Sequence, residues 1–572
     1  MKQTESRDRG VIILLFAVIF LLTYSCSSDR SSSDRSSSKK SSSVKAEDPG
    51  LDLLIKKSIT EWATPAKAVV RKEMIYSAVL VENFYKERDY RPAWSEEGRL
   101  IQVESLLRAV DETYSDGLRS SYYHLGIIRS LVAQAGKEAS LTPTLLADLD
   151  ILLTDAFLTL SCHLSGGCVN PVTIKAEWYA KRGNVDVAAV LEQALKNKEI
   201  KEAVIRFRPE EGSYVRLRQM LAHYRQLFVK GEWPRVSDGS PLKLNSSSSR
   251  VAELRKRLAA SDDLDPDGIT GGDYFDEKLH QSVIGFQKRH GLKADGVVSS
   301  ATLNALNVPL EQRIRQIELN MERLRWTLGN KEQRSVVVNI ANFDLYVIEN
   351  ERSILPMKVV VGMPYWNTPV FTAKMTHLVI NPTWNVPDSI AKKEILKKVK
   401  KDHTYLVKHN IKVLRGWGSA EEILDPDTID WSQVNANRLA YRFRQEPGPL
   451  NPLGKLKFVL PNKFDVYLHD TSAKRLFRED VRTLSHGCTR VEKPLELAEY
   501  LLQGNPRWTR ENIVAAIQKG AEQKVSIPRP LNVHFLYLTA WVDEGGTLQF
   551  RNDIYGRDKL LEEALSEKPS LN

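Results

Sequence analysis

The apolar residues of this chain change their spacing at Ser335, from the period of an α-helix to that of a β-strand. Before that point, apolar stripes at helical spacing run from about Leu51 to Arg235. After it, Val336 to Ile340 and Leu345 to Ile348 flank a short turn, which predicts a β-hairpin. The two patterns need separate cores, and a length of 572 residues fits two to four domains.

The helical half predicts two bodies joined by a linker. Residues 48–236 predict an all-α scaffold domain. Residues 237–249 are rich in Ser, with Gly and Pro, and indicate a linker. Residues 250–308 predict a compact unit of three helices, one capped by Asp276 and another opened by Ser300.

The β half predicts a single mostly β domain over residues 333–545. Between about 388 and 446 the pattern turns helical and charged, and so long an interruption predicts an inserted helical cap over a site. Residues 546–572 are interpreted as a C-terminal tail. The predicted fold class is multidomain α+β, with an all-α scaffold, a small three-helix module and a mostly β domain that carries the cap.

The first 26 residues predict export. Three basic residues precede the unbroken apolar run Val11 to Leu22, which has the length of a signal-peptide core and is short for a membrane span. Cys26 is a candidate lipid acceptor, although Tyr24 departs from the small-residue pattern, and an uncleaved segment would be a membrane anchor. Residues 27–47 are Ser-rich and charged and predict a linker that acts as a tether. We expect a periplasmic location, with the chain held at the inner membrane by this segment or as a lipoprotein.

The net charge indicates which kinds of partner the chain can bind, and the cysteine positions indicate which thiols can pair or react. The formal net charge of +10 suits an anionic partner such as a membrane surface or a cell-wall polymer, and the simpler interpretation spreads it over solvated faces. The sequence has no zinc-finger spacing or phosphate loop, so nucleic acid is not an expected partner. Cys162 and Cys168 are either a small-loop disulfide or two ordinary thiols, and Cys488 has no obvious partner, which marks a reactive thiol in an exported protein.

Residues that carry chemistry follow one another near the C-terminal end. Phe464 to His469 alternate, so that Tyr467 and His469 share the polar face of a predicted strand. Downstream lies Ser485-His486-Gly487-Cys488-Thr489-Arg490, in which Gly487 permits a tight bend that could aim two amides at one point. A thiol nucleophile needs a lowered pKa, a nearby base and an oxyanion donor pair, and His469 beside Cys488 would favour the thiolate by charge pairing.

This pattern resembles the signature of the L,D-transpeptidase catalytic domain, and residues 381–387, 447–454 and 468–471 agree with it. The motif Phe286-Gln287, Gly291-Leu292 and Asp295-Gly296, followed by Thr302-Leu303, resembles the three-helix peptidoglycan-binding domain. The order of anchor, scaffold, peptidoglycan-binding module and catalytic domain with a cap is similar to the large scaffold-bearing branch of the family. Many relatives carry Asn where this chain has Arg490, whereas that branch also carries Arg.

The resemblance implies a role for each residue of the catalytic signature. Cys488 would be the acylated nucleophile and His469 the general base. The backbone of Asp470 would orient the His469 ring, and the amides of Gly487 and Cys488 would hold the oxyanion.

The resemblance also implies residues that bind the substrate. Arg490 and His486 would shape the site or bind a substrate carboxylate, which a guanidinium does well in bidentate fashion. Ser485 would fix the turn by hydrogen bonding. Tyr467 and Trp384 are candidate walls of the donor groove, with core packing as the alternative interpretation.

The implied reaction has two steps and requires no metal or cofactor. The thiolate attacks the carbonyl of the third stem residue of a donor tetrapeptide, usually meso-diaminopimelate, and the terminal D-Ala leaves. The side-chain amine of another stem then resolves the thioester and gives a 3→3 cross-link. The implied partners are peptidoglycan stem peptides, cell-wall glycan and, through the N-terminal anchor, the membrane. Carbapenem acylation of Cys488 is expected.

Other functions fit parts of the same pattern. Water as the acceptor would make an L,D-carboxypeptidase, and a lipoprotein lysine would make an anchoring enzyme. A non-catalytic peptidoglycan-binding scaffold is the alternative from another class, against which the intact His469, Gly487 and Cys488 argue. The alternative interpretation of the three-helix module is a spacer without a ligand. A zinc site at His469, His486 and Cys488 would lack a carboxylate partner shell.

Overall fold

A computed structural model of the protein describes residues 50–135, 142–174, 178–179, 185–327 and 332–567. All of them belong to one compact unit, residues 49–572. The predicted signal or anchor, with its candidate lipid acceptor Cys26, and the predicted tether lie outside the described residues. Within those residues, no helix combines the length and the apolar character needed to cross a bilayer.

The scaffold is built around one central helix, α5 (Pro143–Gly166), which is buried along most of its length. It is buried on every side, with buried polar residues such as Asp150 and Asp155 among the apolar ones, as expected of a helix enclosed by others. Thr142 caps its first turn by accepting a hydrogen bond from the Leu145 N–H at 3.3 Å, and Pro143 occupies the first helical position. Cys168 is buried in the scaffold core just beyond this helix, and Cys162 packs at the edge of that core.

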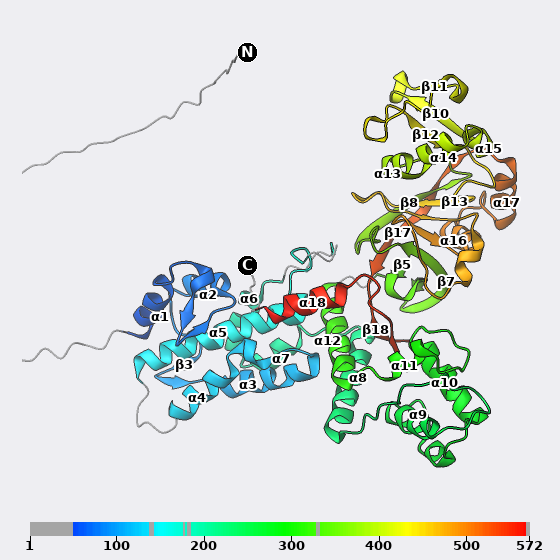
Figure 1. Ribbon diagram of the computed structural model, residues 1–572. Helices are drawn as coiled ribbons and strands as arrows, with labels where there is room; N and C mark the ends of the chain where they lie inside the picture. The colour runs from blue at the N-terminus through cyan, green and yellow to red at the C-terminus, as the bar shows by residue number, and fades with distance from the viewer. Residues whose placement is uncertain (1–49, 136–141, 175–177, 180–184, 328–331, 568–572) are drawn as a thin grey trace, which may run out of the picture. The chain divides into compact units, whose positions relative to one another are not determined.

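Shorter helices surround α5 (Figure 1). They are α1 (Leu51–Thr60), α2 (Ala78–Glu87), α3 (Val103–Glu112), α4 (Leu125–Ala135), α6 (Val187–Asn197) and α7 (Ile200–Ile205). Two short hairpins also occur, β1 (Val69–Val70) with β2 (Glu73–Met74) and β3 (Ser95–Glu96) with β4 (Arg99–Leu100). The scaffold is therefore helical as predicted, with two small hairpins that the helical spacing does not reveal.

The predicted three-helix module is confirmed as α9 (Ser249–Ala260), α10 (Glu277–Arg289) and α11 (Ser300–Leu306). Asp276 caps α10 as predicted, by accepting a hydrogen bond from the Leu279 N–H at 2.8 Å. The Ser-rich stretch predicted as a linker belongs in part to this module. Its residue Leu242 is buried in the module core and pairs with Val298, and Ser247 pairs with Tyr274.

The β half forms a nine-stranded sheet in the order β15-β7-β16-β14-β13-β8-β17-β5-β6. Because β6 also pairs with β7, the sheet closes on itself around an apolar core. The predicted hairpin is confirmed as an antiparallel pair, with Val336 opposite Val347. The strands are β5 (Arg334–Asn339), β6 (Asp344–Glu349), β7 (Arg352–Gly362), β8 (Thr372–Ile380), β13 (Leu456–Val459), β14 (Leu468–His469), β15 (Thr483–Ser485), β16 (Thr489–Val491) and β17 (Gln523–Leu536).

Two helices that follow the catalytic signature cover this closed sheet. Helix α16 (Pro494–Leu501) begins at Pro494, where the sequence places a helix start. It buries Leu497 and Leu501 in the core of the sheet, and α17 (Arg510–Lys519) adds Ile513. This packing holds the strands that carry the signature.

The predicted cap exists and has its own apolar core, but it is not purely helical. It contains α13 (Asp388–Ile390), a π-helical turn (Ala391–Ile395), α14 (Leu396–Lys401) and α15 (Tyr405–Lys408). It also holds a four-stranded sheet in the order β11-β10-β12-β9. These strands are β9 (Trp384–Asn385), β10 (Ile411–Arg415), β11 (Glu422–Leu424) and β12 (Arg442–Gln445). All four are short, and β10 and β12 carry Lys or Arg, so their alternation is weak in the sequence.

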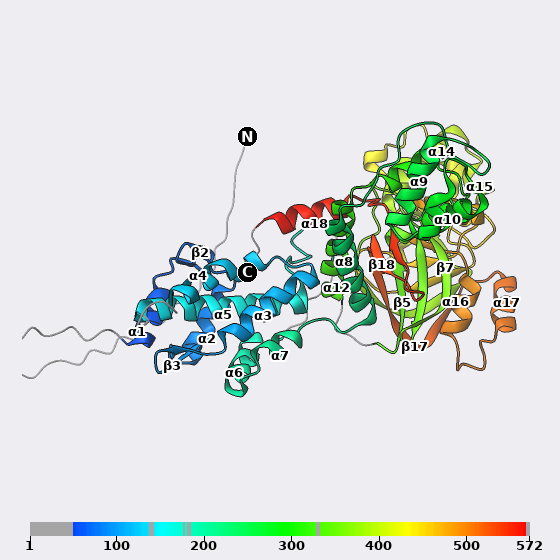
Figure 2. The same ribbon diagram turned by 90° about the horizontal axis from the view of Figure 1, so that it is seen from below.

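Residues 546–572, interpreted from the sequence as a tail, contain regular structure. Strand β19 (Leu548–Phe550) completes a hairpin with β18 (Ala540–Val542), and helix α18 (Arg557–Ser566) follows. This hairpin packs with two helices that precede the closed sheet in the chain, α8 (Gly212–Lys230) and α12 (Leu310–Thr327). Helix α18 lies beside α12 (Figures 1 and 2), where Arg315 Nε is 3.1 Å from Glu562 Oε1.

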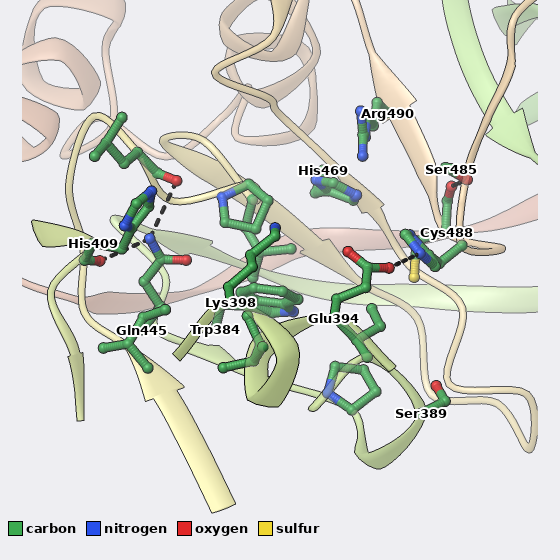
Figure 3. A pocket seen from close by; sticks show the side chains of 18 of the residues that line it. Trp384, Ser389, Glu394, Lys398, His409, Gln445, His469, Ser485, Cys488 and Arg490 are labelled. Carbon is green, nitrogen blue, oxygen red and sulfur yellow. Dashed lines mark hydrogen bonds and ion pairs between the residues drawn. The ribbon is translucent and has the colours of Figure 1, made fainter. Parts of the chain in front are cut away.

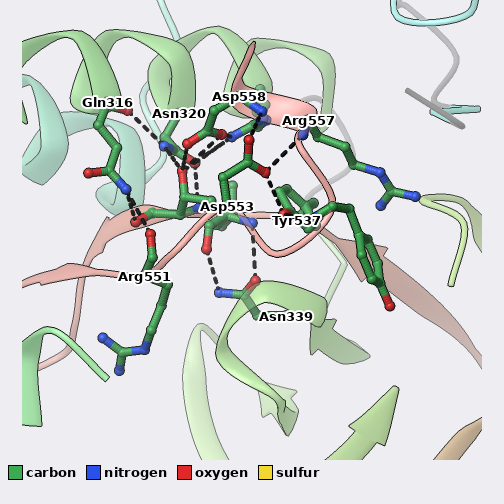
Figure 4. A network of polar contacts seen from close by, with 12 residues as sticks. Gln316, Asn320, Asn339, Tyr537, Arg551, Asp553, Arg557 and Asp558 are labelled. Carbon is green, nitrogen blue, oxygen red and sulfur yellow. Dashed lines mark hydrogen bonds and ion pairs between the residues drawn. The ribbon is translucent and has the colours of Figure 1, made fainter. Parts of the chain in front are cut away.

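A buried polar network joins this C-terminal segment to the rest of the unit (Figure 4). The Asn320 amide donates to Thr539 Oγ1 at 2.8 Å, and Arg323 forms an ion pair with Asp558 at 2.5 Å. From the same segment, Arg557 Nη2 donates to the carbonyl oxygen of Thr368 at 3.1 Å. The C-terminal segment is thereby tied to the loop that precedes β8, next to the catalytic signature.

Candidate active site

His469 lies at the end of β14, between two strands that each place a cation beside it. Across β13 its partner is Lys457, and across β16 its partner is Arg490. Directly opposed residues of neighbouring strands project from the same face, so the three side chains form one row. The predicted alternating strand from Phe464 is shorter than expected, because Asp465 adopts a left-handed φ of 53° and the strand begins at Leu468.

The hydrogen bonding of His469 defines which ring nitrogen is basic. Its side chain is buried, and Nδ1 lies 2.5 Å from the carbonyl oxygen of Asp470. A carbonyl can only accept, so Nδ1 carries the proton and Nε2 holds the lone pair. The Asp470 carboxylate accepts from the Lys455 N–H at 2.8 Å and pairs with Lys474 Nζ at 2.5 Å, which fixes this backbone segment.

Cys488 immediately precedes β16 and stands across from Tyr467. The parallel register pairs Leu468 with Thr489, so Cys488 and Tyr467 are the next neighbours along the two strands. The thiol Sγ is 3.7 Å from the Asp465 carbonyl oxygen, and Tyr467 lies close enough to the sulfur to lower the pKa of the thiol. Cys488 forms no disulfide with any described residue.

Hydrogen bonds on three sides fix the turn that presents Cys488. Ser485 Oγ donates to the Cys488 carbonyl at 2.5 Å and accepts from the Gly487 N–H at 3.2 Å. Thr368 Oγ1 donates to the Gly487 carbonyl at 2.8 Å. Gly487 has a φ of 109°, which disfavours any residue with a side chain.

This arrangement changes one expectation. The sequence predicts the Gly487 N–H as an oxyanion donor, whereas in the structure that group is engaged by Ser485 Oγ. No described residue accepts a hydrogen bond from the Cys488 N–H, which is therefore the donor that this turn offers to a ligand.

Burial sets the protonation of the pair. It lowers the pKa of His469 to about 3, and the Arg490 and Lys457 cations act in the same direction, against the hydrogen bond to Asp470. Burial also raises the pKa of the Cys488 thiol, while its Tyr467 hydrogen bonds and the same two cations oppose that rise. The pair therefore rests as a thiol beside a neutral imidazole. The sequence suggests a thiolate instead, because charge pairing can be inferred from residue types and burial cannot.

His469 and Cys488 open into one cavity of about 330 Å³ between the closed sheet and the cap (Figure 3). The cap contributes Trp384, Glu394 and Lys398 to its lining. Trp384 is half-buried and also packs against the cap core, so it is both a cavity wall and a core residue. Tyr467 lines the same cavity, and Lys457 Nζ lies 3.8 Å from the centre of its ring.

Arg490 is a cation of this cavity whose guanidinium forms no ion pair with a carboxylate of the described residues. Its Nε is buried and has no hydrogen-bond partner among the described residues. Burial lowers the pKa of its guanidinium, and among the described residues Cys488 is the group that acts in the opposite direction. That this guanidinium binds a substrate carboxylate stays a prediction.

His486 connects the nucleophile turn to the cap. Its Nε2 lies 2.7 Å from Glu394 Oε1, and its ring centre lies 4.1 Å from that of Trp366. That His486 shapes the site or binds a substrate carboxylate stays a prediction; the structure shows its contact with the cap. Within the described residues, no three His, Cys, Asp or Glu side chains are placed to hold a metal ion, including the alternative zinc set with His469 and Cys488.

Four site residues escape the sequence pattern. Lys457 lies in a predicted strand, but its place beside His469 depends on strand pairing. Glu394 belongs to the cap, Thr368 to a loop, and Asp465 acts through its main-chain carbonyl. None of these has a local signal in the sequence, because each contact joins segments far apart in the chain.

Comparison with known proteins identifies the closed sheet. Residues 333–509 match the family described as the L,D-transpeptidase catalytic domain. The chain carries an L,D-transpeptidase catalytic domain. Residues 79–221 match the "Scaffold domain" and residues 247–306 the "Putative peptidoglycan binding domain". The resemblance found in the sequence is confirmed for the catalytic domain and for the module.

Individual relatives cover parts of the chain. A Haemophilus influenzae protein named "Putative L,D-transpeptidase" is 35% identical over 246 residues, which is 43% of this chain and 48% of that protein. The chain thus spans about half the length of this L,D-transpeptidase relative. An N-acetylmuramoyl-L-alanine amidase of Mycobacterium tuberculosis is 39% identical over 80 residues, 13% of this chain and 20% of the amidase. The crystal structure of an L,D-transpeptidase from Stackebrandtia nassauensis, 12% identical, covers 53% of this chain and 96% of its own, with a TM-score of 0.19 that supports no comparison of detail.

Proposed function

We propose that the protein is a peptidoglycan L,D-transpeptidase that forms 3→3 cross-links between stem peptides through a thioester on Cys488. The observation that carries this proposal is the pairing of β14 with β16, which brings the His469 imidazole and the Cys488 thiol to one cavity. A thiol, a base with a free lone pair and an amide donor on the same turn are the groups that acyl transfer needs.

In the first step, Cys488 Sγ attacks the carbonyl carbon of the third stem residue while His469 Nε2 takes the thiol proton. The pair rests neutral, so this proton moves as the carbon–sulfur bond forms. Lys457 and Arg490 stabilise the negative charge that develops on the sulfur, and the Cys488 N–H faces the oxyanion.

The same two cations disfavour the imidazolium that results. His469 therefore returns the proton readily to the nitrogen of the leaving D-Ala, and the carbon–nitrogen bond breaks to give the thioester.

In the second step, a side-chain amine of another stem attacks the thioester carbon. The carbon–sulfur bond breaks, its electron pair goes to the sulfur, and the amine proton passes to His469 and on to the thiolate. This restores the resting pair and leaves an amide cross-link. The uncompensated guanidinium of Arg490 would hold a stem carboxylate during both steps.

The N-terminal segment and the peptidoglycan-binding module support a function outside the cytoplasm. The basic and apolar N-terminal sequence supports export to the periplasm, with the chain held there by that segment or as a lipoprotein. The peptidoglycan-binding module would keep the catalytic domain at cell-wall glycan.

Product analysis tests the proposal. The full chain is incubated with a disaccharide-tetrapeptide, and the products are separated and sequenced by tandem mass spectrometry. We expect D-Ala and dimers that contain a 3→3 bond, and none from Cys488→Ala. Hydrolysed tripeptide alone would indicate an L,D-carboxypeptidase, and transfer to a lipoprotein lysine would indicate an anchoring enzyme. If no product forms, the function that remains is peptidoglycan binding without turnover.

A further inference from the structure

A cavity of about 340 Å³ lies where the three-helix module meets the C-terminal hairpin, and it shares no lining residue with the active-site cavity. Its walls come from the end of α10, from α11, from α12 and from β19 with the residues that follow it. Its polar lining consists of His290, Asn304, Arg313, Arg551 and Asn552, and no described Asp or Glu lines it. This lining suits an anionic ligand.

Arg313 brings to the cavity a buried positive charge that no carboxylate balances. Its Nη1 donates to Gln316 Oε1 and its Nη2 to the Ala305 carbonyl, each at 3.0 Å. Both acceptors are neutral. Burial lowers the pKa of this guanidinium to about 10, so it still carries its charge at neutral pH.

Arg551 adds a second guanidinium from the residue after β19. Its Nε donates to Asn342 Oδ1 at 2.6 Å, and its Nη1 donates to the Arg289 carbonyl at 2.9 Å. A Cβ atom at Gly291 would lie 2.4 Å from Arg551 Cδ, so the glycine of the module motif permits this close approach. Gln316 Nε2 donates to the Arg551 carbonyl at 2.9 Å (Figure 4), and Gln316 therefore contacts both arginines.

The carboxylates around this junction have other partners. Asp263 forms an ion pair with Arg289 at the end of α10. Burial lowers the pKa of Arg551 to about 10 against the attraction of Asp344, and Asp344 forms an ion pair with Arg482 at 3.4 Å. The cavity therefore keeps an excess of positive charge. An unbalanced buried charge is costly in free energy, and an anion bound in the cavity would offset that cost.

His290 adds a hydrogen-bond acceptor to the two cations. Its buried ring stacks on Phe286 at 3.8 Å and on Phe550 at 5.5 Å between centres. Nδ1 lies 2.8 Å from the Phe286 carbonyl oxygen, so Nδ1 carries the proton and Nε2 holds a lone pair that no described residue engages. The cavity thus suits a carboxylate that has an N–H group beside it, as in a peptide.

We infer that this cavity binds a carboxylate of a peptidoglycan stem peptide, at a site separate from the active site, with Arg313 and Arg551 as its cations and His290 as its acceptor. The choice of peptidoglycan as the source of the carboxylate rests on the proposed function. Both arginines lie outside residues 247–306, which match the peptidoglycan-binding family, so the module does not form this site by itself.

Asn304→Asp tests the inference, because Asn304 is exposed on α11 and the change puts a carboxylate into the cavity without removing a side chain. The full chain carrying Cys488→Ala is the parent, so that no turnover occurs, and its apparent Kd for insoluble peptidoglycan is measured by co-sedimentation. We expect Asn304→Asp to raise that Kd at least about tenfold, because the new carboxylate engages the guanidinium groups and repels the anion. Its urea midpoint should be no lower than that of the parent, since the new charge balances the buried cations.

The matched control is Asn197→Asp, which makes the same charge change at the exposed last residue of α6 and should bind like the parent. Amidation of the peptidoglycan carboxylates should weaken binding of the parent by a larger factor than binding of Asn304→Asp. The assignment is overturned by an equal Kd for the parent and Asn304→Asp, by an equal loss in Asn197→Asp, by an equal effect of amidation on both proteins, or by a lower urea midpoint of Asn304→Asp. D-Ala release by the chain with Cys488 intact is a separate measurement, and its absence would refute the proposed function instead.

Discussion

Replacement of Thr368 by Val removes the hydroxyl group that ties the nucleophile turn to the closed sheet. Thr368 is fully buried, and its Oγ1 donates to the Gly487 carbonyl at 2.8 Å and accepts from the Gly362 N–H at 3.0 Å. Valine has nearly the same shape, so the change leaves two buried backbone groups without a partner. Each such group costs about 1–3 kcal/mol, which gives a loss of about 2–6 kcal/mol in the free energy of unfolding.

The same change should slow acylation. The Gly487 carbonyl is one of the groups that orient the turn, and a displacement of about 1 Å in a reacting group can cost about a hundredfold in rate. We expect carbapenem acylation of Thr368→Val, followed by intact-protein mass spectrometry, to slow about 10- to 100-fold. Stability is measured in parallel by urea unfolding.

Thr368→Ser is the matched control, because it keeps the hydroxyl and loses one methyl group, worth about 1 kcal/mol. It should acylate at nearly the wild-type rate. The reasoning is refuted if Thr368→Val unfolds at the wild-type urea concentration and acylates as fast as Thr368→Ser.

Four further results follow from the geometry of the site. Alkylation of Cys488 by iodoacetamide should accelerate with pH up to and beyond the ordinary thiol pKa of 9.0, since burial raises that pKa; a plateau below pH 7 would show a preformed thiolate. His469→Gln should slow carbapenem acylation about 10²- to 10⁴-fold, and a rate near wild type would exclude His469 as the base. As the pH falls below about 6.5, the unfolded wild type takes up a proton that folded His469, with its pKa of about 3, does not. Wild type should therefore lose stability relative to His469→Gln by at most about 1.4 kcal/mol per pH unit, and parallel urea midpoints from pH 7 to 4.5 would contradict this. Gly487→Ala must hold a side chain at a φ of 109° and should lose about 1–3 kcal/mol of stability together with acylation rate, whereas an unchanged melting temperature would show that the turn relaxes freely.

The sequence predicts the features that depend on local pattern. The change of period at Ser335 marks the closed sheet, Asp276 caps its helix, and Pro494 begins the helix after the signature. Cys488 and His469 are apparent because the residues around them resemble the L,D-transpeptidase catalytic signature. These predictions need only spacing and residue type.

Features that depend on pairing between distant segments are missing from the pattern. The row of Lys457, His469 and Arg490 arises from strand register, which the two-residue strand β14 does not reveal. The neutral state of the thiol and imidazole follows from burial, a property of the folded chain. The bridge from Trp178 in the scaffold to Val370 likewise joins segments far apart in the sequence.

The central claim is that the Cys488 sulfur carries the acyl group, and the mass of the trapped intermediate tests it most directly. The full chain is mixed with disaccharide-tetrapeptide and quenched in acid within the first turnovers, and its mass is then measured by intact-protein mass spectrometry. The account predicts an adduct equal to the donor minus D-Ala, located on the peptide that contains Cys488 and absent from Cys488→Ala. An adduct on another residue, or 3→3 dimers formed by Cys488→Ala, would contradict it.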